Sequence, residues 1–248
     1  MEFWDKTFED NFTVYKVSTE KNNETKGLYS WLNKFYSLIG NVKGKNILDI
    51  GCGNGDTSVK LALLGAKVTA IDTSNTAIRN TYELAKYNDV ISSVEIIQMN
   101  AMEINTISQS FDLVTGSFIL HHIEPFNKFV EILTPIIRDG GRAVFLENSA
   151  RNKILIFFRQ FTGKFGIPKY GDEEEFPFQP VEIDMLRIKF DKIILHYPCF
   201  RFFVMASPYL FKKNKIIKSL SSKLDDLVYK NLPFLNKYSY IQIIEIYK

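Results

Sequence analysis

The residues with the clearest chemical potential lie between Asp49 and Asp56, where the chain reads Asp-Ile-Gly-Cys-Gly-Asn-Gly-Asp. Glycine is needed where the backbone adopts a positive φ or where a ligand lies directly against it, and glycines this dense are costly unless something uses them. An ordinary turn from a strand into a helix needs one or two. The spacing therefore predicts a loop that holds a ligand against bare backbone.

Two classes of ligand use a glycine loop at the start of a helix. A dinucleotide places its pyrophosphate there in the pattern G-x-G-x-x-G, but Asp56 stands at the third glycine position of that pattern, where its carboxylate would face the pyrophosphate. S-adenosylmethionine has no phosphate and carries a sulfonium and an ammonium, so nearby acids favour it. Asp49, two residues before the first glycine, is placed to meet the ammonium directly or through water.

From Asp49 to Gly55 the chain closely resembles the first motif of the class I S-adenosylmethionine-dependent methyltransferases, D/E-x-G-x-G-x-G. The resemblance covers residues 40–150 well and the remainder in outline. It implies a Rossmann-like α/β fold, with a seven-stranded, mostly parallel sheet that has one antiparallel strand and helices on both faces. It also implies S-adenosylmethionine as the cofactor, with Asp49, Gly51, Cys52, Gly53 and Gly55 around it.

The adenosine part of this cofactor is expected at the ends of the second and third strands. Asp72 follows the first glycine by about 20 residues, the distance at which an acid accepts hydrogen bonds from an adenosine ribose. It could also cap the helix that follows, and the two roles are compatible. In the resembled family an acid or amide after the third strand binds the adenine, which here implies Asn100 on the amino edge and Met102 on the ring. Thr73 and Ala101 complete this set.

The tip of the fourth strand carries the candidates for proton transfer. It reads Ser117-Phe118-Ile119-Leu120-His121-His122 and resembles the LHH tip of small-molecule and lipid methyltransferases of the ubiquinone-biosynthesis type. Ser117 is expected beside the cofactor. A histidine at this edge can take the proton that a hydroxyl acceptor loses as it attacks. His121 or His122 is therefore a candidate base; alternatively, both cap the following helix and line the cofactor pocket.

Two further residues are candidates for contact with the methyl acceptor. Glu147 ends the fifth predicted strand, where it would orient a polar substrate or lie on the surface. Tyr15 belongs to residues 3–15, which resemble an arm that folds over the cofactor in these enzymes, although packing alone would also explain its aromatic residues. The N/D-P-P-F/Y element of enzymes that methylate nucleobases or glutamine is absent from the fourth strand tip. A small-molecule or lipid-linked acceptor, methylated on oxygen or nitrogen, is favoured.

Hydrophobic patterns predict one domain over residues 1–248. Strands are expected at 46–50, 67–71, 94–99, 111–117, 142–147, 190–197 and 240–247, and helices at 27–39, 57–64, 75–86, 124–137 and 181–187. The predicted parts are an N-terminal arm and helix (1–40), a cofactor-binding core (41–150), a variable connection (151–189) and a helical insertion (198–239).

The insertion is the feature that this chain does not share with the resembled family. It carries phenylalanines, then several lysines including Lys212 and Lys213, around an amphipathic stretch at 216–229. Three interpretations remain open: a lid over the acceptor, a basic and aromatic face that contacts an anionic membrane weakly, or two helices packed on the sheet with solvated lysines.

Composition limits the other classes of function. A net charge of +3 across 248 residues does not demand a polyanion, so no nucleic-acid partner is expected. Two distant cysteines and an acidic N-terminal stretch suggest a reducing cytoplasm. No metal site is expected, because the chain has three histidines and no cysteine cluster.

Three alternative functions stay open at this point. A nicotinamide oxidoreductase is disfavoured by Asp56. A nucleic-acid or protein methyltransferase is disfavoured by the missing element and the mild charge. A catalytically silent protein that binds S-adenosylmethionine would keep the same cofactor motifs.

Overall fold

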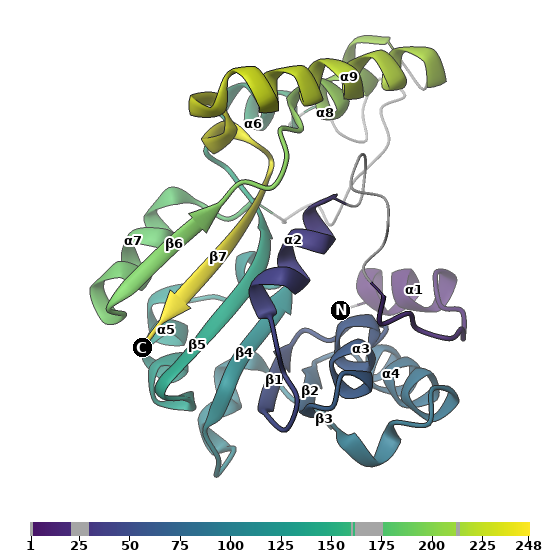
Figure 1. The fold of residues 1–248 in the computed structure, drawn as a ribbon, viewed down its shortest axis with the longest axis vertical. Coiled ribbons are helices and arrows are strands. Elements are labelled where there is room, and N and C mark those ends of the chain that lie inside the picture. Colours follow the sequence, from purple (N-terminus) through teal and green to yellow (C-terminus); the bar gives the residue numbers. More distant parts are fainter. Residues whose placement is uncertain (1, 21–29, 160, 162–175, 212–213) are drawn as a thin grey trace.

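Seven strands form one sheet in the order β3-β2-β1-β4-β5-β7-β6 (Figure 1). The strands are β1 Asn46–Ile50, β2 Lys67–Asp72, β3 Val94–Gln98, β4 Phe111–Ser117, β5 Ile137–Asn148, β6 Lys192–His196 and β7 Ile241–Tyr247. β1 to β5 pair in parallel, and β7 runs antiparallel to both β5 and β6. The predicted fold class, a mostly parallel sheet with one antiparallel strand, is confirmed.

This structure is a computed structural model that describes residues 2–20, 30–159, 161, 176–211 and 214–248. Three predictions fall partly outside the described residues. They concern the first residues of the helix expected at 27–39, much of the connection at 151–189, and the lysines Lys212 and Lys213.

Helices cover both faces of the sheet, because successive residues of a strand point to opposite sides. In β1, Ile47 belongs to the apolar cluster shared with α2, α3 and α4, whereas Leu48 belongs to the cluster shared with α5 and α7. Both side chains are fully buried, and each such burial is worth about 1.5–3 kcal/mol. These helices are α2 Ser30–Ile39, α3 Asp56–Leu63, α4 Asn75–Tyr87, α5 Phe126–Ile136 and α7 Pro180–Lys189.

Strand β5 begins at Ile137, earlier than the predicted start at Arg142. Its pairing with β4 jumps from Phe111 opposite Ile137 to Leu113 opposite Arg142, so residues 138–141 bulge out of the ladder. Gly140 takes a φ of 72° within this bulge. The Gly-Gly pair that suggested a turn before the strand therefore lies inside it.

A separate helical layer lies at one end of the molecule, beyond the ends of β5 and β7 (Figure 1). It consists of α6 Lys153–Arg159, α8 Phe202–Phe211 and α9 Lys215–Asn231, followed by the short helix η4 Pro233–Tyr238. α8, α9 and η4 connect β6 to β7, which confirms the predicted insertion between the last two strands. Among the described helices, none has both the length and the apolar character needed to cross a bilayer.

Candidate cofactor and acceptor site

The loop between β1 and α3 is built so that only glycine fits. Gly51 and Gly55 have φ values of 68° and 87°, which side-chain-bearing residues rarely adopt. A Cβ on Gly51 would lie 2.6 Å from Cγ1 of Ile119, and one on Gly55 would lie 2.8 Å from Cα of Thr81. The loop backbone is therefore packed against α4 and the tip of β4.

Four carboxylates surround this loop, and each accepts a hydrogen bond from an uncharged donor. Asp49 accepts from Ser58 Oγ at 2.5 Å, and Asp72 accepts from the backbone amides of Gly53 at 3.0 Å and Ser74 at 2.9 Å. The other two acceptors are Asp56, bonded by the Tyr15 hydroxyl, and Asp5, bonded by the Ser74 hydroxyl.

Burial makes two of these carboxylates, Asp49 and Asp72, costly to ionise. Asp49 is buried, and its pKa is raised to about 7 by burial, with a further contribution from the charge of Asp72. Burial also raises the pKa of Asp72, to which the charge of Asp5 adds. Because a nearby cation would offset both effects, the electrostatics of the corner favour a positively charged ligand.

The N-terminal helix α1, Glu2–Asp10, lies over this corner. Its Phe8 carbonyl accepts a hydrogen bond from Asn80 of α4 at 3.2 Å, and the Phe8 ring would be 3.3 Å from a Cβ on Gly53. Trp4 meets His122 edge to face at 5.4 Å between ring centroids. The predicted arm thus contacts both the glycine loop and the tip of β4.

The residues expected around adenosine lie at the ends of β2 and β3. Asn100 caps the short helix η2, Ala101–Thr106, by accepting the Met102 amide at 2.9 Å. Thr73 is exposed, and its carbonyl accepts a hydrogen bond from Gln98. The N-cap of α4 is Ser74, so Asp72 does not have the capping role offered as an alternative.

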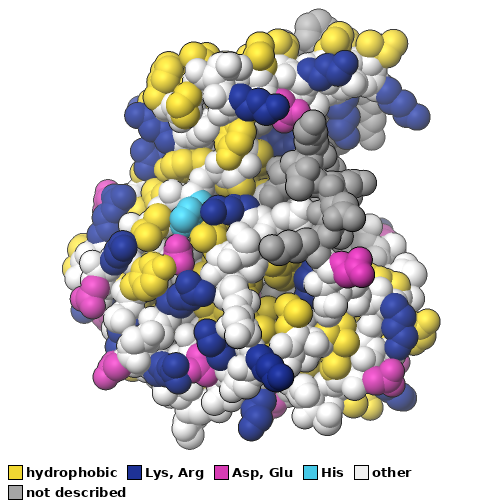
Figure 2. Space-filling view, in the orientation of Figure 1, with side chains coloured by type: hydrophobic (Ala, Val, Ile, Leu, Met, Phe, Trp, Pro, Cys, Tyr) yellow, Lys and Arg dark blue, Asp and Glu magenta, His cyan; other side chains and the backbone are white. Residues whose placement is uncertain are grey.

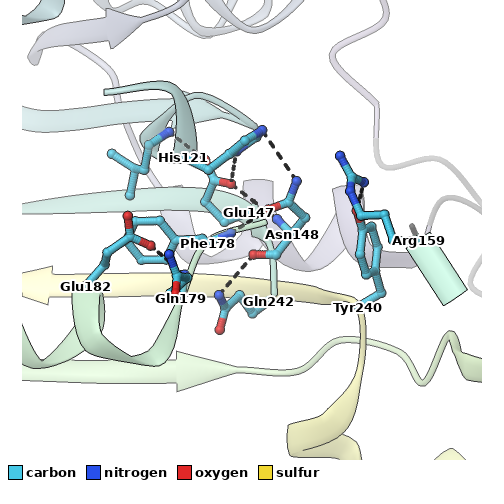
Figure 3. Close-up of polar contacts among 10 residues, drawn as sticks. His121, Glu147, Asn148, Arg159, Phe178, Gln179, Glu182, Tyr240 and Gln242 are labelled. Atoms are coloured by element: carbon cyan, nitrogen blue, oxygen red, sulfur yellow. Dashed lines mark hydrogen bonds and ion pairs between the residues drawn. The ribbon is translucent and has the colours of Figure 1, made fainter. Parts of the chain in front are cut away.

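A buried histidine and carboxylate pair lies at the adjoining ends of β4 and β5 (Figure 3). Nδ1 of His121 is 2.8 Å from Oε2 of Glu147, and the two side chains are 1% and 0% exposed. The other carboxylate oxygen of Glu147 accepts the Leu120 amide at 2.7 Å. Glu147 is therefore held by protein groups, and it fixes the orientation of the His121 ring.

The neighbouring Asn148 anchors this pair to two other segments. Asn148 lies 3.5 Å from Nε2 of His121 through its amide nitrogen, and its side-chain oxygen accepts the Phe178 amide at 2.9 Å. Its carbonyl accepts from Gln242 of β7 at 3.1 Å. His122 is exposed, and its ring lies 4.1 Å from that of His121 between centroids, with the two planes tilted by 37°. The tip of β4 therefore presents one buried and one exposed imidazole.

The fold brings most of the predicted site residues to one edge of the sheet. The members of the cofactor set surround the β1–α3 corner and the strand ends beside it: Asp49, Gly51, Cys52, Gly53, Gly55, Asp72, Thr73, Asn100, Ala101, Met102 and Ser117. Tyr15 joins them through Asp56. Their roles toward a ligand stay predictions, as do the base role of His121 or His122 and the contact of Glu147 and Tyr15 with an acceptor.

Two residues of this region, Asp5 and Gly116, were not predicted from the sequence. Asp5 reaches Ser74 across 69 positions of the chain, and no local pattern marks such a contact. Gly116 precedes the tip of β4, and a Cβ there would lie 2.7 Å from the Ile50 carbonyl oxygen. A glycine near the end of a predicted strand was the available signal for a close backbone approach.

Comparisons with known proteins agree with this geometry. Residues 47–141 match the sequence family described as methyltransferase domain. The mitochondrial ubiquinone biosynthesis O-methyltransferase of Schizosaccharomyces pombe is 38% identical over 102 residues, which cover 41% of this chain and 37% of the relative. The demethylmenaquinone methyltransferase of Listeria welshimeri is 30% identical over 125 residues, or 49% of this chain and 52% of the relative. The chain thus matches about half or less of the length of these relatives.

A solved structure extends the likeness to the whole fold. The N-methyltransferase NodS from Bradyrhizobium japonicum, in complex with S-adenosyl-L-homocysteine, matches with a TM-score of 0.52 and 13% identity, over 99% of this chain and 98% of NodS. The segment that matches the sequence family includes the glycine loop, Asp49, Asp72 and His121. Residues 47–141 are therefore similar to a methyltransferase domain, and the chain as a whole has the fold of solved structures such as NodS.

Proposed function

We propose that the protein transfers a methyl group from S-adenosylmethionine to an oxygen or nitrogen of a small-molecule or lipid-linked acceptor. The observation that carries the proposal is the β1–α3 corner, where bare backbone lies among the carboxylates of Asp5, Asp49, Asp56 and Asp72. S-adenosylmethionine fits this set because it is cationic, has no phosphate and offers ribose hydroxyls. A pyrophosphate would meet the same carboxylates at the start of α3.

Each part of the cofactor has a proposed partner. Asp49 would meet the ammonium, directly or through water, and Asp72 would accept the ribose hydroxyls. Asn100 would bind the amino edge of the adenine, with Met102 against the ring. The remaining members, Thr73, Ala101, Cys52 and Ser117, would line the pocket. When bound, S-adenosylmethionine supplies the activated methyl group and the leaving group.

The protein then has to align the acceptor, exclude water and accept a proton where the acceptor is a hydroxyl. Because Oε2 of Glu147 lies 2.8 Å from Nδ1 of His121, Glu147 would hold the ring proton on Nδ1 and leave Nε2 as the basic nitrogen. Glu147 is proposed as a positioning residue for this ring. His122 is the alternative base on the same tip. It is exposed and meets the ring of Trp4 edge to face.

The setting of the reaction follows from two further features. A reducing cytoplasm is proposed, since the thiols of Cys52 and Cys199 are both free and buried. A lipid-linked acceptor would be met at a membrane surface, so weak membrane contact through residues 198–239 is part of the proposal.

The deciding experiment incubates the protein with methyl-labelled S-adenosylmethionine and separate fractions of small molecules, lipids, RNA and protein. We expect label in the small-molecule or lipid fraction. Label in RNA or protein would contradict the acceptor class, and no transfer despite cofactor binding would favour a silent binding protein.

On the acceptor found in this way, His121→Gln and His122→Gln test the base. Loss of the base should lower kcat by about 10²- to 10⁴-fold while the Kd for the cofactor, measured by calorimetry, stays unchanged. His196→Gln is the matched control, because this histidine pairs with Glu245 on β6 and β7. Unchanged turnover in both tip variants would remove the base role.

A further inference from the structure

Helix α9 has the reverse of the usual amphipathic arrangement. Its buried residues are polar, Ser221 and Asp225. Four aliphatic side chains, spaced at three or four residues, face solvent instead. Their exposed fractions are 72% for Ile216, 55% for Leu220, 47% for Leu224 and 58% for Leu227.

The carboxylate of Asp225 fixes this orientation. It accepts the backbone amides of Phe202 and Phe203 through Oδ1, at 3.0 and 2.9 Å, and that of Val204 through Oδ2 at 2.9 Å. These are the amides at the start of α8 that have no partner within their own helix. Rotating α9 to bury the aliphatic residues would leave both the amides and the carboxylate unpaired. The apolar stripe is thus held outward by the packing of α8 against α9.

The next element adds a further exposed apolar side chain, since Phe234 of η4 is 66% exposed. We call Ile216, Leu220, Leu224, Leu227 and Phe234 the α9 face. Scattered exposed aliphatic residues are ordinary on a protein surface, but a contiguous stripe marks a site of interaction.

The charges beside the α9 face are almost all positive. Five exposed lysines accompany it along α9 and η4: Lys215, Lys218, Lys223, Lys230 and Lys237. The exposed acid of α9 is Asp226, since Asp225 is buried. Figure 2 shows hydrophobic side chains beside Lys and Arg side chains along the helical layer at the top of the view. An apolar stripe flanked by lysines is the pattern of helices that lie in the surface of anionic bilayers.

We propose that the α9 face binds the surface of an anionic lipid bilayer, with α9 parallel to the membrane and its aliphatic side chains among the lipids. A second copy of the chain fits this face less well, because pairing two copies would bring the lysines of one against those of the other. The inference rests on the proposed function in one respect: it assigns specific residues to the membrane contact named there.

Flotation with vesicles of phosphatidylcholine alone, or mixed with phosphatidylglycerol, tests this contact without any methyl acceptor. We expect binding to the anionic vesicles at low salt and little binding to the neutral ones. Lys223→Gln with Lys230→Gln should weaken binding roughly 30-fold, since each lysine near an anionic surface contributes about 1 kcal/mol. Leu220→Gln with Leu224→Gln should weaken it at least about tenfold through lost apolar contact.

Two controls separate a loss of lipid binding from a general effect of surface substitution or a loss of helix. Ile188→Gln removes a residue of α7 that is 78% exposed and lies outside the α9 face, and it should leave lipid binding unchanged. Glutamine favours helix about as well as leucine or lysine, so the far-ultraviolet circular dichroism should not change. Binding to neutral and anionic vesicles alike, no binding at low salt, or a dimer dispersed by the leucine variants would each overturn the proposal. None of these results bears on cofactor binding, which calorimetry measures separately.

Discussion

The β1–α3 corner and the α9 face break the ordinary rules of burial in opposite directions. The corner places the carboxylates of Asp49 and Asp72 inside the protein, where burial raises both pKa values. The α9 face places aliphatic side chains such as Ile216 and Leu227 in water while Asp225 is buried. Each arrangement costs folding free energy, so each points to a partner of complementary chemistry: a cation for the corner and an anionic, apolar surface for the face.

The two regions also differ in how widely they are shared. The glycine loop of the corner, with Asp49, Asp56 and Asp72, lies within residues 47–141, the segment that matches the methyltransferase family, and only Asp5 of the four carboxylates lies outside it. α9 lies outside that segment. The residues of the corner can therefore be compared with those of the family, whereas the role of the α9 face has to be tested in this chain.

The largest expected effect comes from closing the corner with Gly51→Ala. The new Cβ would be strained by the φ of 68° and would lie 2.6 Å from Ile119. The positive φ costs about 1–2 kcal/mol and the clash about 1–3 kcal/mol, so urea unfolding should show a loss of about 2–5 kcal/mol. Calorimetry should detect no cofactor binding, because the loop would have to move.

Gly44→Ala is the matched control for this strain. Gly44 has a φ of 74°, but a Cβ there meets nothing within 4 Å, so it should lose only about 1–2 kcal/mol. Adding Ile119→Ala to Gly51→Ala should recover part of the packing loss. Equal losses for Gly51→Ala and Gly44→Ala would show that the corner is not closely packed, and the contrast with the α9 face would weaken.

A region can be predicted from the sequence when the residues that determine its structure lie close together along the chain. The glycine loop is set by residues within a few positions of one another, and its role and place were predicted. The contact of Asp5 with Ser74 and the pairing of Glu147 with His121 span 69 and 26 positions. Only the folded chain reveals such contacts, so the burial of Glu147 was not predicted.

The orientation of helix α9 in the insertion was likewise not predictable from local sequence. The periodicity of the insertion correctly predicted an amphipathic helix within residues 216–229, observed as α9 Lys215–Asn231. Periodicity does not say which side faces inward, because apolar spacing ordinarily indicates the buried side. The hydrogen bonds from α8 to Asp225 decide the orientation, and they join residues that are more than 20 positions apart.

Removing the charge of Asp49 tests whether the corner favours a cation. Asp49→Asn should keep an acceptor for Ser58 while weakening cofactor binding about 10- to 100-fold, as expected for the loss of a hydrogen bond to a charged group. The same variant should raise the stability of the free protein. The pKa of about 7 against an ordinary 3.8 sets an upper limit of about 4 kcal/mol on that gain.

The gain in stability from Asp49→Asn should depend on pH. Because folding raises this pKa, ionising Asp49 costs stability, and that cost grows between pH 4 and about 7 and is constant above. The gain from Asp49→Asn should therefore be absent below pH 4 and complete above pH 7. A cationic cofactor prefers the ionised carboxylate, so its Kd should fall as pH rises to 7 in the wild type and change less in Asp49→Asn, where Asp72 alone keeps a raised pKa. Parallel pH profiles in the two proteins would contradict the role of Asp49.

The smallest of these effects tests whether the two regions are independent. Asp225→Ala should leave the amides of Phe202, Phe203 and Val204 without their acceptor and destabilise the packing of α8 on α9 by about 2–3 kcal/mol. Asp226→Ala, next to it but exposed, should change stability by less than about 0.5 kcal/mol. Hydrogen exchange at the three amides should speed up in the first variant alone. Cofactor affinity should be the same in both, because the donors that the structure describes for the corner carboxylates, Tyr15, Gly53, Ser58 and Ser74, all lie outside α8 and α9. A weaker cofactor Kd in Asp225→Ala would mean that the helical layer supports the corner, and the two departures from normal burial would then belong to one site.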